Sequence, residues 1–283
     1  MNALDIRQKR YSLDLKPRQK KFNVGLVVKI ALIAAAVIAV IILAKYFYDL
    51  SQIRTSYLAG REEITVGVRC DVPAFGSEDE EGNITGFDRD ISERIIRDIF
   101  GDEIIIKYIP LWSENAGAAV KYDQADIAVG FIVPGTDKAS TFAVTDPYYY
   151  DRAVAVTNPG ASAVLSGKKV GILNTEINVS TVEDYAKDQD IEIKDIIRYY
   201  DYESARNDLM SGAIDIFVMP YQLAKQYFGD KFEISSEELF DVPYCMLFPV
   251  GEGGIADVFS DDIKALEESG DMDNMTKKWG VSY

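Results

Sequence analysis

The sequence from residue 62 onward alternates β-branched runs with amphipathic runs, and it completes this alternation twice. In the first block, Ile91, Ile95, Ile96 and Ile99 recur at the spacing of one helix face. Strands that alternate with helices indicate a mostly parallel sheet covered by helices. Two blocks of about 90 residues each therefore predict two α/β lobes, not one continuous sheet. The strands are expected at 64–69, 104–109, 126–133, 168–173, 191–200, 215–219 and 244–249, and the helices at 86–100, 116–122, 181–188, 202–211 and 256–268.

A continuous apolar run precedes these blocks at residues 24–44, interrupted only by Lys29. Its length matches the roughly 20 residues that cross a bilayer core, and the aromatic residues 46–48 that follow are typical of a membrane interface. Residues 1–23 hold seven Lys/Arg and two Asp, which predicts a cytoplasmic N-terminus and an exported remainder. A cleavable signal peptide is the alternative, but the Ala-rich positions lie inside the run and favour an uncleaved signal-anchor.

Charge and residue types exclude several functions. The net charge is −16, and residues 51–283 alone hold 43 acidic against 21 basic side chains, so a nucleic-acid partner is not expected. The sequence has no histidine, which removes Ser-His-Asp and Cys-His catalysis and nearly all catalytic zinc sites. Cys70 and Cys245 are either two buried thiols, the preferred interpretation, or a long-range disulfide. We expect no cofactor, no metal site and no catalytic residues.

Seven short segments, in the right order from residue 62 to 283, resemble family 3 of the extracellular solute-binding proteins, which serve polar amino-acid ABC transporters. The most specific is GNITGFDRDI at 82–91, which is similar to the G-x-x-x-G-F-D-x-D-L motif of that family. Each motif alone is weak, and seven in register are strong evidence for the fold. The other six segments are 66–75, 126–130, 145–149, 212–216, 243–251 and 277–280.

The resemblance implies a two-lobed α/β clamp of the type 2 periplasmic-binding-protein fold, which closes on a small polar ligand for an ABC permease. With the N-terminal transmembrane helix, it predicts a membrane-tethered, extracytoplasmic binding protein, not an enzyme. A tethered sensor without a transport role, and a dehydratase-like enzyme with Glu176 as its acid, are the alternatives. The expected parts are a cytoplasmic tail at 1–23, a transmembrane segment at 24–45, a stalk at 46–61, lobe one at 62–150 plus 244–283, and lobe two at 151–243.

The sequence departs from the family where an amino acid is normally held. Lys138 stands where the family has an arginine for the ligand carboxylate, and it lacks the two-point fork of a guanidinium. Val133 replaces a hydroxyl donor. A free amino acid is therefore the default ligand and not a deduction. The predicted ligand-binding residues are Arg69, Asp71, Phe75, Trp112, Lys138, Asn174, Thr175, Glu176 and Tyr221.

Each candidate also has a structural interpretation. Phe75 and Trp112 either stack on the ligand or pack on lobe one, and Arg69 and Asp71 either meet the ligand or form surface ion pairs. Residues 174–176 either contact the ligand or cap the following helix, with Glu176 as the natural partner of a ligand cation. Asp88 and Asp90 are interpreted as capping a helix start and complementing its dipole.

Overall fold

The computed structural model describes residues 24–112, 115–136, 139, 141–229 and 231–281. The chain divides into two compact units, Met1–Tyr48 and Asp49–Tyr283. Helix α1 (Val24–Thr55) supplies the described part of the first unit and the first residues of the second. Within it, Val27–Thr55 is apolar and long enough to cross a membrane, with a mean hydropathy of 3.0 in its most apolar window.

The first lobe is built on a five-stranded sheet in the order β4-β1-β5-β13-β6. Strand β1 pairs in parallel with β4 and β5, and β13 pairs antiparallel with β5 and β6. A small hairpin of β2 (Ser77–Glu78) and β3 (Ile84–Thr85) lies outside this sheet. The strands of the main sheet are β1 (Glu63–Arg69), β4 (Ile105–Leu111), β5 (Ile127–Val129), β6 (Ala143–Val144) and β13 (Leu247–Phe248).

Strand β5 is shorter than the strand predicted at 126–133. It ends at Val129 because Gly130 and Phe131 take positive φ angles of 109° and 54°, which a strand cannot contain. A positive φ is uncommon for a bulky residue such as phenylalanine. This turn directs the buried Phe131 ring toward Arg69 and the aromatic core.

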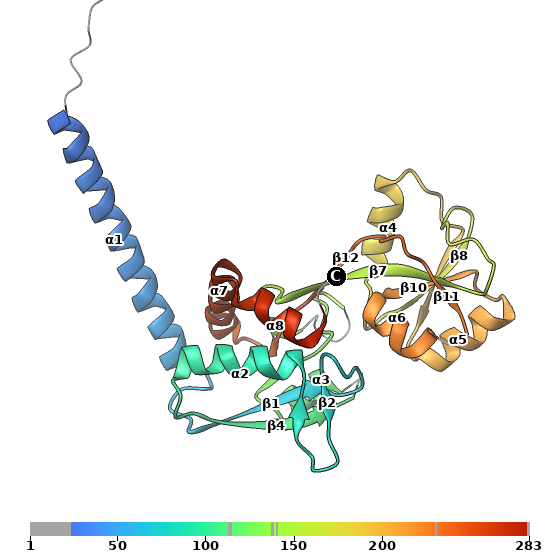
Figure 1. Ribbon diagram of the computed structural model, residues 1–283, viewed down its shortest axis with the longest axis horizontal. Helices are drawn as coiled ribbons and strands as arrows, with labels where there is room; N and C mark the ends of the chain where they lie inside the picture. Colours follow the sequence, from blue (N-terminus) through green and yellow to red (C-terminus); the bar gives the residue numbers. More distant parts are fainter. Residues whose placement is uncertain (1–23, 113–114, 137–138, 140, 230, 282–283) are drawn as a thin grey trace, which may run out of the picture. The chain divides into compact units, whose positions relative to one another are not determined.

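The second lobe holds a six-stranded sheet in the order β11-β7-β10-β8-β9, with β12 also paired to β7. Strands β8, β9 and β10 are parallel, while β7 runs antiparallel to β10. Figure 1 shows helices α5 (Tyr202–Ser211) and α6 (Tyr221–Phe228) side by side against this sheet. The strands are β7 (Tyr149–Thr157), β8 (Lys169–Leu173), β9 (Asp195–Tyr199), β10 (Ile216–Pro220), β11 (Glu233–Ile234) and β12 (Asp241–Tyr244).

Two separate sheets confirm the prediction of a two-lobed α/β fold, and β7 and β12 connect them as an antiparallel pair. Tyr150 pairs with Pro243 and Arg152 with Asp241. The buried Asp151 carboxylate accepts hydrogen bonds from the Tyr244 hydroxyl at 2.8 Å and from the Gln222 N–H at 3.1 Å. Asp151 thus joins both connecting strands to the first turn of α6.

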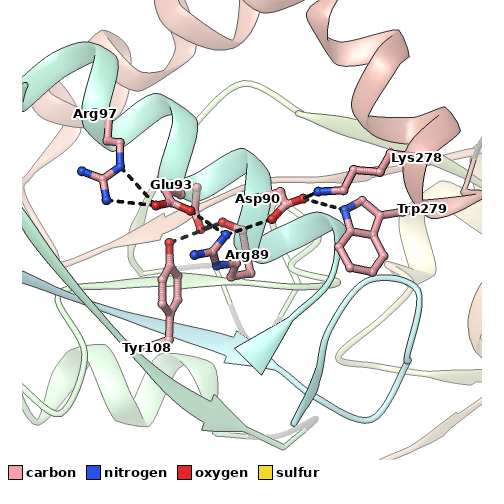
Figure 2. A network of polar contacts seen from close by, with 8 residues as sticks. Arg89, Asp90, Glu93, Arg97, Tyr108, Lys278 and Trp279 are labelled. Atoms are coloured by element: carbon pink, nitrogen blue, oxygen red, sulfur yellow. Dashed lines mark hydrogen bonds and ion pairs between the residues drawn. The ribbon is translucent and has the colours of Figure 1, made fainter. Parts of the chain in front are cut away.

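Helix α2 (Phe87–Phe100) contacts the C-terminal helices α7 (Gly253–Ser269) and α8 (Asp271–Trp279), beside which it lies in Figure 1. Ile91, Ile95 and Ile96 are fully buried, as the helical spacing of the isoleucines predicts. On the polar side, Asp90 accepts hydrogen bonds from Lys278 Nζ at 2.6 Å and Trp279 Nε1 at 2.8 Å (Figure 2).

The interpretation of Asp88 and Asp90 as helix caps is wrong. The N-cap of α2 is Gly86, and no side chain caps this helix. Both aspartates lie in the first turn, where they complement the helix dipole, but Asp90 bonds to α8 and the buried Asp88 bonds to Tyr148. The remaining helices are α3 (Ala116–Lys121) and α4 (Val179–Asp188).

Candidate functional site

Charged and aromatic side chains from the carboxyl ends of three strands meet where the two lobes contact each other. Arg69 is the last residue of β1, Phe131 follows β5 by two positions, and Glu176 follows β8 by three. Tyr202 begins α5 and Tyr227 lies near the end of α6. Open α/β sheets bind ligands at this end of their strands. We call Arg69, Asp71, Phe131, Glu176, Tyr202 and Tyr227 the interlobe cluster.

The guanidinium of Arg69 is the centre of the cluster. Its Nε and Nη2 donate to Oδ1 and Oδ2 of Asp71 at 2.6 and 3.1 Å, and its Nη1 donates to Oε1 of Glu176 at 3.1 Å. The guanidinium carbon lies 4.9 Å from the centre of the Phe131 ring. The side chain of Arg69 is only 3% exposed and that of Glu176 is completely buried. A surface ion pair, the alternative interpretation of Arg69, therefore does not describe its surroundings.

Two tyrosines of the second lobe complete the cluster. The Tyr227 hydroxyl donates to Oδ2 of Asp71, and the Tyr202 hydroxyl donates to Oε1 of Glu176 at 3.5 Å. The two rings stack with centroids 4.3 Å apart and planes at 24°. Both carboxylates of the cluster are thereby bonded to a tyrosine as well as to Arg69.

These contacts keep Arg69 and Asp71 charged. Burial acts to lower the pKa of Arg69, but the Glu176 carboxylate and the hydrogen bond to Asp71 raise it well above its ordinary value. Burial acts to raise the pKa of Asp71, and the hydrogen bonds from Arg69 and Tyr227 lower it below its ordinary value. The pKa of Tyr227 rises to about 12, through burial and its bond to Asp71. The Tyr227 hydroxyl therefore stays protonated near neutral pH.

Of the predicted ligand-binding residues, the structure brings Arg69, Asp71 and Glu176 together and places Phe75 and Trp112 elsewhere. Phe75 is completely buried among Phe131, Tyr149 and Tyr244, so its ring offers no surface to a ligand in this conformation. Trp112 is 57% exposed just after β4.

Residues 174–176 form the turn between β8 and α4. The N–H groups of Glu176 and Ile177 both donate to the carbonyl of Leu173, at 2.9 and 3.0 Å, and the N–H of Asn174 donates to the carbonyl of Tyr199. The N-cap of α4 is Asn178, so residues 174–176 do not cap this helix. The Asn178 side chain instead donates across the lobes to the carbonyl of Pro134 at 3.0 Å.

Thr175 of the second lobe borders a cavity of about 720 Å³ whose other described lining residues belong to the first lobe. On the side of the first lobe this cavity is bordered by Gly117, Lys121, Asp123 and Thr141. The cavity is therefore lined by one residue of each charge, Lys121 and Asp123, and by two threonines.

Tyr221 lies outside the cluster, and the position of Lys138 is not among those that the structure describes. The Tyr221 ring lies under the guanidinium of Arg152, 4.1 Å from the guanidinium carbon to the ring centre, beside the connecting strands. Lys138, predicted to contact a ligand carboxylate, lies outside the described residues. Its role stays a prediction.

Sequence reasoning missed Phe131, Tyr202 and Tyr227. The sequence pattern places Phe131 inside a strand, whereas its positive φ of 54° turns its ring toward Arg69. The two tyrosines lie 25 residues apart in sequence on different helices, and only the packing of α5 beside α6 stacks them. Their one signal in the sequence is the high tyrosine content, 17 of 283 residues, which does not single out any position.

Oε1 of Glu176 accepts hydrogen bonds from both Arg69 and Tyr202. Within the described residues, no group of three or more carboxylates and thiols is arranged to hold a metal ion. The geometry suits recognition of a polar group.

One known protein family matches most of this chain. The family described as bacterial extracellular solute-binding proteins, family 3, matches residues 64–282. The glutamine-binding protein GlnH of Bacillus subtilis, from an ABC transporter, is 23% identical over 227 residues, which cover 77% of this chain and 81% of that protein. The L-arginine-binding protein of Pseudomonas aeruginosa is 22% identical over 267 residues, covering 89% of this chain and 96% of that protein.

Solved structures give the same fold. An ancestral arginine-binding protein bound to arginine has a TM-score of 0.56 and 22% identity, with 77% of this chain and 98% of that chain covered. The amino-acid ABC transporter binding protein AbpA of Streptococcus pneumoniae, bound to L-arginine, has a TM-score of 0.55 and 21% identity, with 77% and 94% covered. These likenesses confirm the two-lobed periplasmic-binding-protein architecture.

Proposed function

Because this chain belongs to the bacterial extracellular solute-binding proteins of family 3, we propose that it captures an amino acid between its lobes and delivers it to the permease of an ABC importer. Its relatives include glutamine-, arginine- and cystine-binding proteins. Capture takes place outside the cytoplasm, where this family acts.

The observation that carries the proposal is the buried contact of Arg69 with Glu176. It joins the carboxyl end of β1 in the first lobe to the loop after β8 in the second. Charged side chains are not buried unless they are paired, so these two residues mark a polar interior between the lobes. Such an interior suits a polar ligand that is enclosed when the lobes close.

The cavity beside Thr175 supports an amino acid as that ligand. Its volume of about 720 Å³ is large enough to hold an amino acid. Lys121 and Asp123 offer one charge of each sign to a zwitterion, and the hydroxyls of Thr141 and Thr175 offer hydrogen bonds. Lys138, seven positions beyond Phe131, is the further candidate for the ligand carboxylate.

Ligand binding is tested by thermal unfolding of the fragment 49–283, which contains every described residue of the hydrophobic core. The panel holds amino acids, opines, dicarboxylates and small peptides. A ligand at 100 times its dissociation constant stabilises the fragment by about 2.7 kcal/mol, which raises the Tm of a fragment this size by about 5–10 °C. Lys138→Ala abolishes the shift if Lys138 binds the carboxylate, and Lys264→Ala, an exposed lysine of α7, leaves it unchanged.

Two results contradict the proposal. If no amino acid of the panel raises the Tm, the ligand class is wrong. If incubation consumes the ligand that binds, the protein is an enzyme. Loss of the shift in both lysine variants points to an effect of net charge and not to a contact with Lys138.

We also propose that α1 is an uncleaved anchor, with the N-terminus in the cytoplasm. The basic residues before α1 and its apolar length support this. The full chain, expressed in a bacterium, is expected in the membrane fraction after carbonate washing. Protease added outside spheroplasts is expected to degrade residues 49–283 and to leave an N-terminal epitope intact. A soluble product that lacks residues 1–44 contradicts the anchor.

A further inference from the structure

Arg69 occupies a complete binding site for a guanidinium group. Asp71 accepts from two of its nitrogens, Glu176 accepts from a third, and Phe131 faces the guanidinium plane from 4.9 Å. A bidentate carboxylate, a second carboxylate and an aromatic face are the groups with which proteins recognise guanidinium ligands. Here the guanidinium comes from the protein itself.

The second lobe supplies half of this site. Glu176, Tyr202 and Tyr227 belong to the second lobe, while Arg69, Asp71 and Phe131 belong to the first. Two bonds therefore cross between the lobes inside the cluster, Arg69 to Glu176 and Tyr227 to Asp71. Each of these two bonds joins a side chain of one lobe to a side chain of the other.

The charges explain why Arg69 stays in place. Asp71 and Glu176 carry two negative charges against one positive charge, and both carboxylates are largely removed from water. Without the guanidinium, two like charges would share one buried space at high cost. A cation is required there, and Arg69 is the one that the fold supplies.

We propose that Arg69 is a tethered occupant of the guanidinium site in the interlobe cluster, and that it holds the two lobes closed without a ligand. This inference does not depend on which ligand the protein captures. It has two measurable consequences. The ligand-free protein is closed, and removal of the Arg69 side chain creates a vacant site for a small guanidinium.

The closed state is tested by small-angle X-ray scattering on the ligand-free fragment 49–283. We compare it with the double variant Glu176→Gln/Tyr227→Phe, which keeps side-chain volume while it neutralises one interlobe contact and removes the other. The variant is expected to have a larger radius of gyration than the unmodified fragment. A matched control is Glu93→Gln/Tyr108→Phe, because these residues belong to a network within the first lobe (Figure 2). The control is expected to keep the radius of the unmodified fragment.

The vacant site is tested with Arg69→Ala and ethylguanidinium, with ethylurea as the neutral probe of the same shape. Ethylguanidinium is expected to raise the Tm of Arg69→Ala and to leave the Tm of the unmodified fragment unchanged. Ethylurea is expected to raise the Tm of neither protein. Equal effects of both probes, or of ethylguanidinium on both proteins, overturn the assigned site. If Arg69→Ala does not fold, the scattering comparison still decides the proposal.

The outcomes separate this inference from the proposed function. If the unmodified fragment and Glu176→Gln/Tyr227→Phe have equal radii, or if the control expands as much as the variant, the tethered occupant is overturned whether or not an amino acid binds. If the radii differ as expected while no amino acid raises the Tm, the proposed role of Arg69 is supported and the proposed ligand class is wrong.

Discussion

The Tyr148 hydroxyl donates a 2.8 Å hydrogen bond to Oδ1 of Asp88, whose Oδ2 has no hydrogen-bond partner among the described residues. Asp88 is completely buried in the first turn of α2. Burial raises its pKa from 3.8 to about 7, and Tyr148 and Arg69 offset only part of this rise. A carboxyl group next to the ion-paired Arg69 is therefore half protonated near neutral pH.

This raised pKa predicts a stability that depends on pH. Between about pH 4 and about pH 7 the folded protein holds a proton on Asp88 that the unfolded chain releases, so stability falls as the pH rises through this range. Asp88→Asn removes the titration. The Tm of the unmodified protein is expected to fall relative to that of Asp88→Asn as the pH is raised. Asp257→Asn, at an exposed position of α7, serves as the control. The prediction is contradicted if the difference in Tm between Asp88→Asn and the unmodified protein does not change with pH.

Gly130 is expected to tolerate no side chain. It has a φ of 109°, and an added Cβ would lie 2.6 Å from the Cβ of Arg69. Gly160 also has a positive φ, of 75°, but has no atom within 4 Å of such a Cβ. Both alanine substitutions strain the backbone, and only Gly130→Ala adds a clash, which costs about 1–3 kcal/mol more. Urea denaturation measures the difference, and equal losses would show that the loop after β5 yields to the methyl group.

The contacts of α8 with α2 predict unequal effects of two substitutions. Lys278 is 61% exposed, so Lys278→Ala is expected to cost less than about 1 kcal/mol. Asp90→Ala removes the acceptor of Lys278, Trp279 and Arg89 together and is expected to cost about 1–3 kcal/mol. Chemical denaturation of both variants checks the order. A larger loss in Lys278→Ala would contradict it.

The two cysteines are predicted to be unreactive thiols. Both are free and buried, and burial raises the pKa of Cys70 and of Cys245 to about 12. Ellman's reagent is therefore expected to react slowly with the native fragment and with two thiols after denaturation. A reducing agent should not change the Tm. No reaction in denaturant would reveal a disulfide and contradict the structure.

The elements could be predicted from the sequence where periodicity alone determines them. The isoleucines of α2 at helical spacing are buried as expected, and two rounds of alternating strands and helices correspond to two sheets. Boundaries failed where tertiary contacts act, since Gly130 and Phe131 end β5 early. The terminal helix expected at 256–268 extends over Gly253–Ser269, and a further helix, Asp271–Trp279, follows after the left-handed Gly270.

The site was less predictable than the fold. Arg69, Asp71 and Glu176 are expected near a ligand because each lies at or just beyond the end of a predicted strand, and they do meet. The bond of Arg69 to Asp71 is local, but its bond to Glu176 depends on the distance between two lobes, which no local pattern encodes. Phe75 was expected either to stack on a ligand or to pack on lobe one, and it lies in the aromatic core. The sequence shows that a ring is present but not which neighbours surround it.

Strand β13 has a consequence for the order in which the chain folds as it is synthesised. Leu247 pairs with Ala128 of β5 and with Val144 of β6, so a strand near the C-terminus fills the middle of the first sheet. That sheet stays incomplete until residue 248 is available for pairing. All six strands of the other sheet lie within residues 149–244. The second lobe can therefore reach its native form before the first lobe, whose strands come from both sides of this segment.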